Sequence, residues 1–114
     1  MDWTVVRAAG VGARVEAIYD HLLATLLDFG EAAGKAHARC SARIDEIEAI
    51  IDALAKAPFQ GVRDDALLPG LRHVTKDRAI LYFKPDADRQ IIEVLAVFHG
   101  GQDHTRRMLA RMLR

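Results

Sequence analysis

The sequence predicts a single α+β domain, residues 1–114, with the element order β-α-α-β-β-β-α. Apolar residues recur at spacings of three and four between residues 11 and 54, which is typical of amphipathic helices. β-branched, aromatic and aliphatic residues dominate between residues 71 and 99, which is typical of strands. At 114 residues, the chain is long enough for one core and too short for a second domain.

The amino-terminal half is predicted to form one strand and a pair of helices. Residues 3–6 are a short β-prone run. Residues 11–29 form the first helix, and Gly30 is well placed to end it. A second helix begins near Glu31 and stops before Pro58, because proline has no backbone N–H to donate and its ring clashes with the preceding turn. Two long helices joined at a glycine are typical of an antiparallel hairpin.

The carboxy-terminal half is predicted to form a meander of three strands. A loop over residues 58–70 precedes it, since this stretch holds two prolines and Gly61. The strands cover residues 71–75, 78–84 and 90–99. The short turns between them imply antiparallel neighbours, so the helical hairpin is expected to pack on one face of a twisted antiparallel β-sheet.

A short helix is predicted at the carboxy terminus. Gly100 and Gly101 end the last strand, and Asp103 can cap a helix that starts at His104. The sheet face opposite the hairpin is then left for a partner, a target or this last helix.

Charge and cysteine content exclude several classes of protein. The 16 basic and 16 acidic residues cancel, so the whole molecule has no field that would attract nucleic acid or an anionic membrane. The basic residues cluster at the carboxy terminus, with no acid among them. These residues are Arg106, Arg107, Arg111 and Arg114. One cysteine, Cys40, cannot form an internal disulfide, which favours the reducing cytoplasm. With no signal sequence and no apolar run of about 18 residues, the chain is expected neither to be secreted nor to enter a membrane.

Four segments at the joints between elements carry a family resemblance. They are residues 58–61, 70–72, 77–83 and 91–103. In this order they resemble the RelE/ParE superfamily of toxins from type II toxin-antitoxin modules, over nearly the whole chain. His99 and Asp103 at the end of the last strand resemble the ParE-like branch. Where ParE-like sequences often place an arginine in this ending, the chain has Gly101 and Gln102.

The resemblance implies a cytoplasmic toxin of a plasmid stabilisation module, without a cofactor and neutralised by a cognate antitoxin. A ParE-like toxin inhibits DNA gyrase by binding it. The alternative, a RelE-like toxin, is a ribosome-dependent endoribonuclease that cleaves mRNA, and a second alternative is a solitary homologue that is not toxic. The implied assembly is a homodimer or a toxin-antitoxin hetero-oligomer. The antitoxin is expected on the sheet face opposite the hairpin, because exposed apolar area of that kind needs a cover.

The candidate residues for contacts with a partner or target lie in the second half of the chain. They are Arg72, Arg78, Lys84, His99, Asp103, Arg107 and Arg111. No metal site is expected, since His99 and His104 straddle a Gly-Gly break and no third ligand is near in sequence.

An endoribonuclease would use Arg78, Tyr82 and His99 on one surface. Arg78 or Lys84 would hold a phosphate, His99 would exchange a proton, and Tyr82 would stack on a base. Because side chains alternate along a strand, Arg78, Tyr82 and Lys84 are expected to share a face of their strand, and His99 to share a face of the last strand with Glu93. The structural interpretation places Tyr82 in the core and makes His99 a hydrogen-bonded residue at a strand end. Arg78 would then hold a turn or contact the antitoxin.

Overall fold

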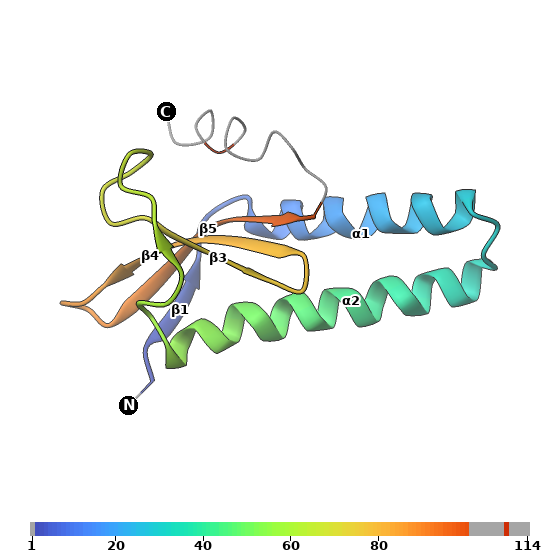
Figure 1. The fold of residues 1–114 in the computed structure, drawn as a ribbon. Coiled ribbons are helices and arrows are strands. Elements are labelled where there is room, and N and C mark those ends of the chain that lie inside the picture. Colours follow the sequence, from blue (N-terminus) through green and yellow to red (C-terminus); the bar gives the residue numbers. More distant parts are fainter. Residues whose placement is uncertain (1, 101–108, 110–114) are drawn as a thin grey trace.

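The structure, a computed structural model, describes residues 2–100 and residue 109. The elements, in chain order, are β1 (Thr4–Arg7), α1 (Val11–Asp28), α2 (Ala33–Ala53), the 3-10 helix η1 (Leu54–Lys56), β2 (Val62–Arg63), β3 (Arg72–Lys76), β4 (Ala79–Asp86) and β5 (Ile91–His99) (Figure 1). The predicted α+β class and the order of strand, helical hairpin and meander are confirmed. Leu109 is helical, while the rest of the predicted final helix, with Asp103 as its cap, lies outside the described residues.

The five strands form one sheet in the order β1-β5-β4-β3-β2. The pairs β3–β4 and β4–β5 are antiparallel, as the short turns predict. The pair β2–β3 is also antiparallel, whereas β1 pairs with β5 in parallel. Strand β2, inside the predicted loop over residues 58–70, is an addition to the predicted elements. The last strand in sequence is therefore hydrogen-bonded on both sides, to β1 and to β4.

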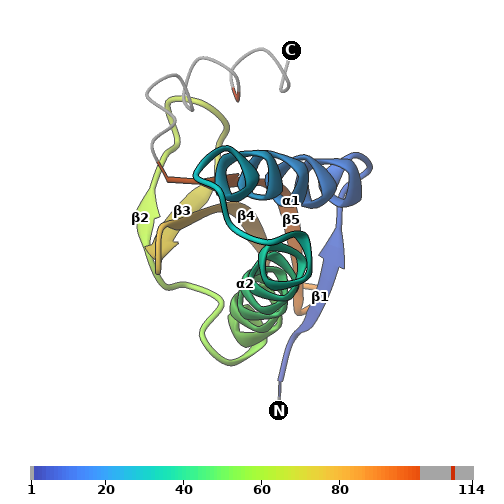
Figure 2. The ribbon, with the colours of Figure 1, turned by 90° about the vertical axis from the view of Figure 1, so that its right-hand side faces the viewer.

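Helices α1 and α2 pack together on one face of this sheet (Figure 2). Gly30 ends the first helix as predicted: its φ of 87° lies in the left-handed region that favours glycine, and its N–H donates to the Leu27 carbonyl at 2.9 Å. The buried core between the helices and the sheet consists of Val11, Val15, Ile18, Ile47, Ile51, Leu54, Ala79, Leu81, Phe83, Ile92, Val94 and Val97.

A second, smaller core lies on the opposite face of the sheet. It consists of Leu71, Tyr82, Ala96, Phe98 and Leu109. The half-buried Leu67 and Leu68, from the loop between β2 and β3, pack against it. This face is thus partly covered by the chain itself, with the half-buried Ile80 and Leu95 beside the covered part.

An irregularity in the β4–β5 pairing changes which residues of β5 face the hairpin. Tyr82 pairs with Ala96, but the next residue, Phe83, pairs with Val94, so Leu95 is an extra residue on β5. Val97 therefore faces the hairpin together with Val94, three residues away. His99 follows Val97 on that face, which corrects the expectation that it shares a face with Glu93.

We predict that Leu81→Ala lowers the free energy of unfolding by about 2–5 kcal/mol, because it leaves a cavity where a fully buried side chain joins β4 to the hairpin. Urea denaturation followed by circular dichroism measures the change. Thr75→Ala, on the exposed surface of β3, serves as the control and should shift the free energy by less than about 0.5 kcal/mol. Equal midpoints for the two variants would contradict the assigned core.

Candidate functional site

A hollow of about 410 Å³ lies where one end of the sheet meets the helical hairpin. We call it the basic hollow, and its lining consists of Leu22, Thr25, Leu26, Arg39, Cys40, Ala42, Arg43, Glu46, Arg78 and His99. Helices α1 and α2, the β3–β4 turn and the end of β5 all contribute. Figure 1 shows that the hairpin continues beyond this end of the sheet, and the hollow lies beside the second half of α1 and the middle of α2.

Arg78 reaches the basic hollow because it belongs to a turn. Asp77 and Arg78 have positive φ angles of 48° and 70°, the conformation of a two-residue hairpin turn whose twist matches the flanking strands. The N–H of Gly100 donates to the Arg78 carbonyl at 2.7 Å and ties the turn to the end of β5. Strand β4 begins one residue later, at Ala79, so Arg78 does not share a strand face with Tyr82 and Lys84 as the sequence predicts.

His99 is held in the basic hollow by a hydrogen bond from α2. The Nε–H of Arg43 donates to His99 Nε2 at 3.0 Å, which requires an unprotonated Nε2. Burial lowers the pKa of the His99 imidazole, because it disfavours the charged form. The positive charges of Arg43 and Arg78, with that of His21, lower this pKa further. His99 is therefore a neutral hydrogen-bonded residue at a strand end, as the structural interpretation expects.

Arg43 is the most enclosed cation of the basic hollow, with 17% of its side chain exposed. Besides His99, it bonds Glu46, whose Oε2 accepts from Nη1 at 2.7 Å. Its remaining nitrogen, Nη2, is buried and has no hydrogen-bond partner within the described part of the chain. Such a donor is costly to bury unless something accepts from it.

The basic hollow combines positive charge with an apolar lining. Three arginines line it against one acid, Glu46. Arg39 lies mostly exposed at its edge and bonds Glu31 at 2.7 Å. Leu22, Leu26 and Ala42 supply the apolar part. Sequence reasoning missed Arg39 and Arg43, although their spacing of four residues places them on the same side of a helix and was a usable signal.

Tyr82 lies away from the basic hollow, in the core on the opposite face of the sheet. Its side chain is buried, and its ring lies 5.3 Å from that of His73 and 6.0 Å from that of Phe98, centroid to centroid. The structural interpretation of Tyr82 is confirmed. The predicted catalytic set of Arg78, Tyr82 and His99 is thereby divided, because the sheet separates Tyr82 from the other two.

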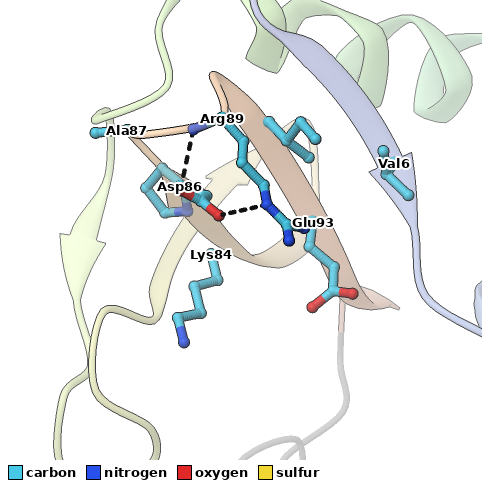
Figure 3. A pocket seen from close by; sticks show the side chains of 8 residues that line it. Val6, Lys84, Asp86, Ala87, Arg89 and Glu93 are labelled. Carbon is cyan, nitrogen blue, oxygen red and sulfur yellow. Dashed lines mark hydrogen bonds and ion pairs between the residues drawn. The ribbon is translucent and has the colours of Figure 1, made fainter.

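Two other predicted contact residues, Arg72 and Lys84, lie away from the basic hollow. Arg72 donates from Nη1 to the Phe59 carbonyl at 2.7 Å, and its guanidinium lies 5.6 Å from the centre of the Phe59 ring. Lys84 lines a second pocket, of about 530 Å³, at the β4–β5 turn and beside β1 (Figure 3). Both signs of charge are present there, on Lys84, Asp86, Arg89 and Glu93. Asp103, Arg107 and Arg111 lie outside the described residues.

Residues 2–100 and 109 contain neither a cluster of metal-ligating side chains nor a helix that could span a membrane. No group of three or more histidine, cysteine, aspartate or glutamate side chains is placed there to hold a metal ion. Neither long helix combines the length and apolar character needed to cross a bilayer. His104, one half of the histidine pair considered above, falls outside this part of the chain.

We predict that His99 titrates below its ordinary pKa of 6.5, and that Arg78→Gln raises this pKa only partway, because burial is the larger cause and remains. NMR titration of the imidazole signals measures both values. Since the unfolded chain takes up this proton near pH 6.5, the free energy of unfolding should fall as the pH drops below 6.5, until the pKa of the folded state is passed. Arg89→Gln, in the second pocket, is the control. A His99 pKa that Arg78→Gln leaves unchanged would refute the assigned electrostatic effect of Arg78 on His99.

Comparison with known proteins supports the fold. No protein-family model matches the sequence, and no curated protein matches it. Among solved structures, a chain of the chromosomal ParDE toxin-antitoxin system of P. aeruginosa is 17% identical, with a TM-score of 0.66 over 86% of this chain and 96% of that one. A chain of the RelBE2 toxin-antitoxin complex from Mycobacterium tuberculosis is 15% identical, with a TM-score of 0.51 over 87% of this chain and 99% of that one. The chain therefore shares the fold of these two chains, which is the fold that the resemblance described above implies.

Proposed function

We propose that this protein is the toxin of a type II toxin-antitoxin module, that it inhibits DNA gyrase by binding it in the manner of ParE-like toxins, and that a cognate antitoxin neutralises it. The observation that carries the proposal is the likeness of fold to a chain of a ParDE system, over most of both chains. The ParE-like ending of β5, with His99 and Asp103, adds to it from the sequence. A role in plasmid stabilisation belongs to the same proposal.

Action by binding is favoured over catalysis by the division of the predicted catalytic set. An RNase acting through the 2′-hydroxyl needs an acid, a base and cations converging on one phosphate. Tyr82 is buried on the far side of the sheet from His99. The lone pair of His99 Nε2 already accepts a hydrogen bond from Arg43, so this nitrogen is not free to take a proton.

The RelE-like endoribonuclease remains the second candidate, on one specific observation. Arg78 and His99 line the same hollow, together with Arg39 and Arg43. Three guanidinium groups can stabilise the charge of a phosphorane-like transition state, and a neutral imidazole can act as a base once it is released from Arg43. This candidate therefore requires the hydrogen bond between Arg43 and His99 to break when RNA binds, so that His99 Nε2 can accept a proton from the RNA.

The antitoxin is proposed to bind the sheet face opposite the hairpin. Ile80 and Leu95 are half-buried there beside the smaller core, and Leu67 and Leu68 cover only part of that core. An amphipathic segment laid on this face would bury the apolar area that remains. The assembly would then be a toxin-antitoxin hetero-oligomer, with a homodimer of the toxin as the alternative.

We predict that induction of the protein in bacteria relaxes plasmid DNA and activates DNA-damage signalling before protein synthesis falls. Plasmid supercoiling on chloroquine gels, a DNA-damage reporter and pulse labelling of new protein measure the three responses in order. Immediate arrest of translation with cut transcripts would replace the gyrase proposal by the endoribonuclease. A folded, soluble protein without any growth defect would favour the solitary, non-toxic homologue.

A double variant, Arg78→Ala with His99→Ala, separates the two toxic candidates further. An endoribonuclease that uses these side chains should lose its cleavage by a factor of 100 or more, on the order expected when a general base is removed. Gyrase inhibition by binding should persist, since it needs no proton transfer. A folded double variant that no longer inhibits purified gyrase would count against the binding proposal as stated.

A further inference from the structure

We propose that the basic hollow binds a single carboxylate from an acidic, partly apolar peptide segment of a partner protein. The natural source of that segment is the antitoxin, so this inference rests on the proposed function and adds a second contact, on the hairpin side of the sheet. The hollow has a volume of about 410 Å³, which is enough for one or two side chains and too small for a folded domain.

The unmet hydrogen-bonding capacity of Arg43 is the first argument. Its Nε–H and one Nη1–H are used by His99 and Glu46, while Nη2 is buried without an acceptor in the described part of the molecule. A buried guanidinium nitrogen left in this way costs more than a neutral donor would. An oxygen that enters the hollow from outside would satisfy it, and a carboxylate oxygen forms the stronger, charge-assisted bond.

Arg78 provides a second cation at the same place. Its backbone is tied to Gly100, yet no ion pair of its guanidinium is found among the described residues. Arg43 comes from α2 and Arg78 from the β3–β4 turn, and both line the hollow. A carboxylate between them would be held from two elements of the fold, which gives geometric specificity as well as charge.

The surroundings of the basic hollow favour a peptide over a nucleic acid. Leu22, Leu26 and Ala42 form an apolar part of the lining that suits an aliphatic side chain next to the acid. Glu46 lies in the lining, and Glu31 is paired with Arg39 at its edge. These acids would repel a chain of successive phosphates but leave room for one carboxylate. The net charge of zero offers no compensating long-range attraction for a polyanion.

The state of His99 fits the same occupant. Because Nε2 accepts from Arg43, the ring carries its proton on Nδ1 and is neutral. A neutral imidazole adds no positive charge that would draw Glu46 away from Arg43. The hollow therefore offers donors from two side chains, Arg43 and Arg78, while its one acid, Glu46, is already engaged by Arg43.

The first arm of the test uses synthetic probes and the full chain at low salt. The probe is acetyl-Ala-Leu-Glu-Leu-Ala-amide, and its twin carries glutamine in place of glutamate. NMR of the arginine Nε–H signals and of the His99 ring should show saturable shifts with the glutamate peptide and at least about tenfold weaker binding of the glutamine peptide. Arg43→Gln and Arg78→Gln should each weaken the glutamate peptide about tenfold, whereas Arg89→Gln, in the second pocket, should not.

Three results of this first arm would overturn the inference. One is equal binding of the two peptides, and another is absence of any shift at Arg43, Arg78 and His99 at millimolar peptide. The third is a single-stranded RNA oligonucleotide that binds more tightly and displaces the peptide, which would assign the hollow to nucleic acid. Arg78 is exposed and joins no core, so Arg78→Gln remains informative even if Arg43→Gln fails to fold.

The second arm uses the product of the adjacent open reading frame as the ligand, with isothermal titration calorimetry. Binding to the wild-type chain that weakens about tenfold in Arg78→Gln, but not in Arg89→Gln, is the expected result. Binding that Arg78→Gln leaves unchanged would overturn the inference while the antitoxin proposal stands. No binding to the wild-type chain would count against the proposed antitoxin, and the peptide probes would still decide whether the hollow takes a carboxylate.

Discussion

The structure depends on the double-sided burial of one strand. Strand β5 is hydrogen-bonded to β1 on one side and to β4 on the other, and it has an apolar layer on each face. Val94 and Val97 lie against the hairpin, while Ala96 and Phe98 lie in the smaller core. Two residues on one face cannot be three positions apart in a regular strand, so the extra residue at Leu95 is what places Val94 and Val97 on the same face.

This extra residue also decides to which face of the sheet His99 points at the end of β5. Without it, His99 would point to the same face as Glu93, away from α2. With it, His99 meets Arg43 at 3.0 Å and closes one side of the basic hollow. The turn that carries Arg78 is fixed to the same strand end through Gly100. A feature of core packing thus brings the end of β5 to the polar side chains of α2.

The elements could be predicted from the sequence because burial sets their periodicity, and α1 ends within one residue of the predicted limit at Phe29. Strand β2 was missed because its two residues are exposed and form no repeating pattern. The bulge at Leu95 was missed because aliphatic residues fill both faces of β5, so an inserted residue leaves no mark in the composition. The site could be predicted only in part for the same reason. Arg78 and His99 were both candidates, but the alternation of residues along a strand does not reveal the bulge and the turn that bring them to one hollow. The spacing of Arg39 and Arg43 places them on one side of α2, but the sequence does not show that the end of β5 lies beside them.

A chain with no net charge can still present a local cationic site if its acids are engaged elsewhere. Glu48 of α2 is an example, since it pairs with Arg7 of β1, and the hydrogen bond from Arg7 lowers the pKa of this carboxyl. Glu31 is held by Arg39 at the edge of the hollow. Glu48 thus fastens α2 to the sheet, whereas Glu46 of α2 and Glu31, which precedes α2, bound the hollow. The arginines of the basic hollow therefore act over a short range and are enclosed by apolar side chains. They suit the recognition of one anionic group in direct contact and give little attraction at a distance.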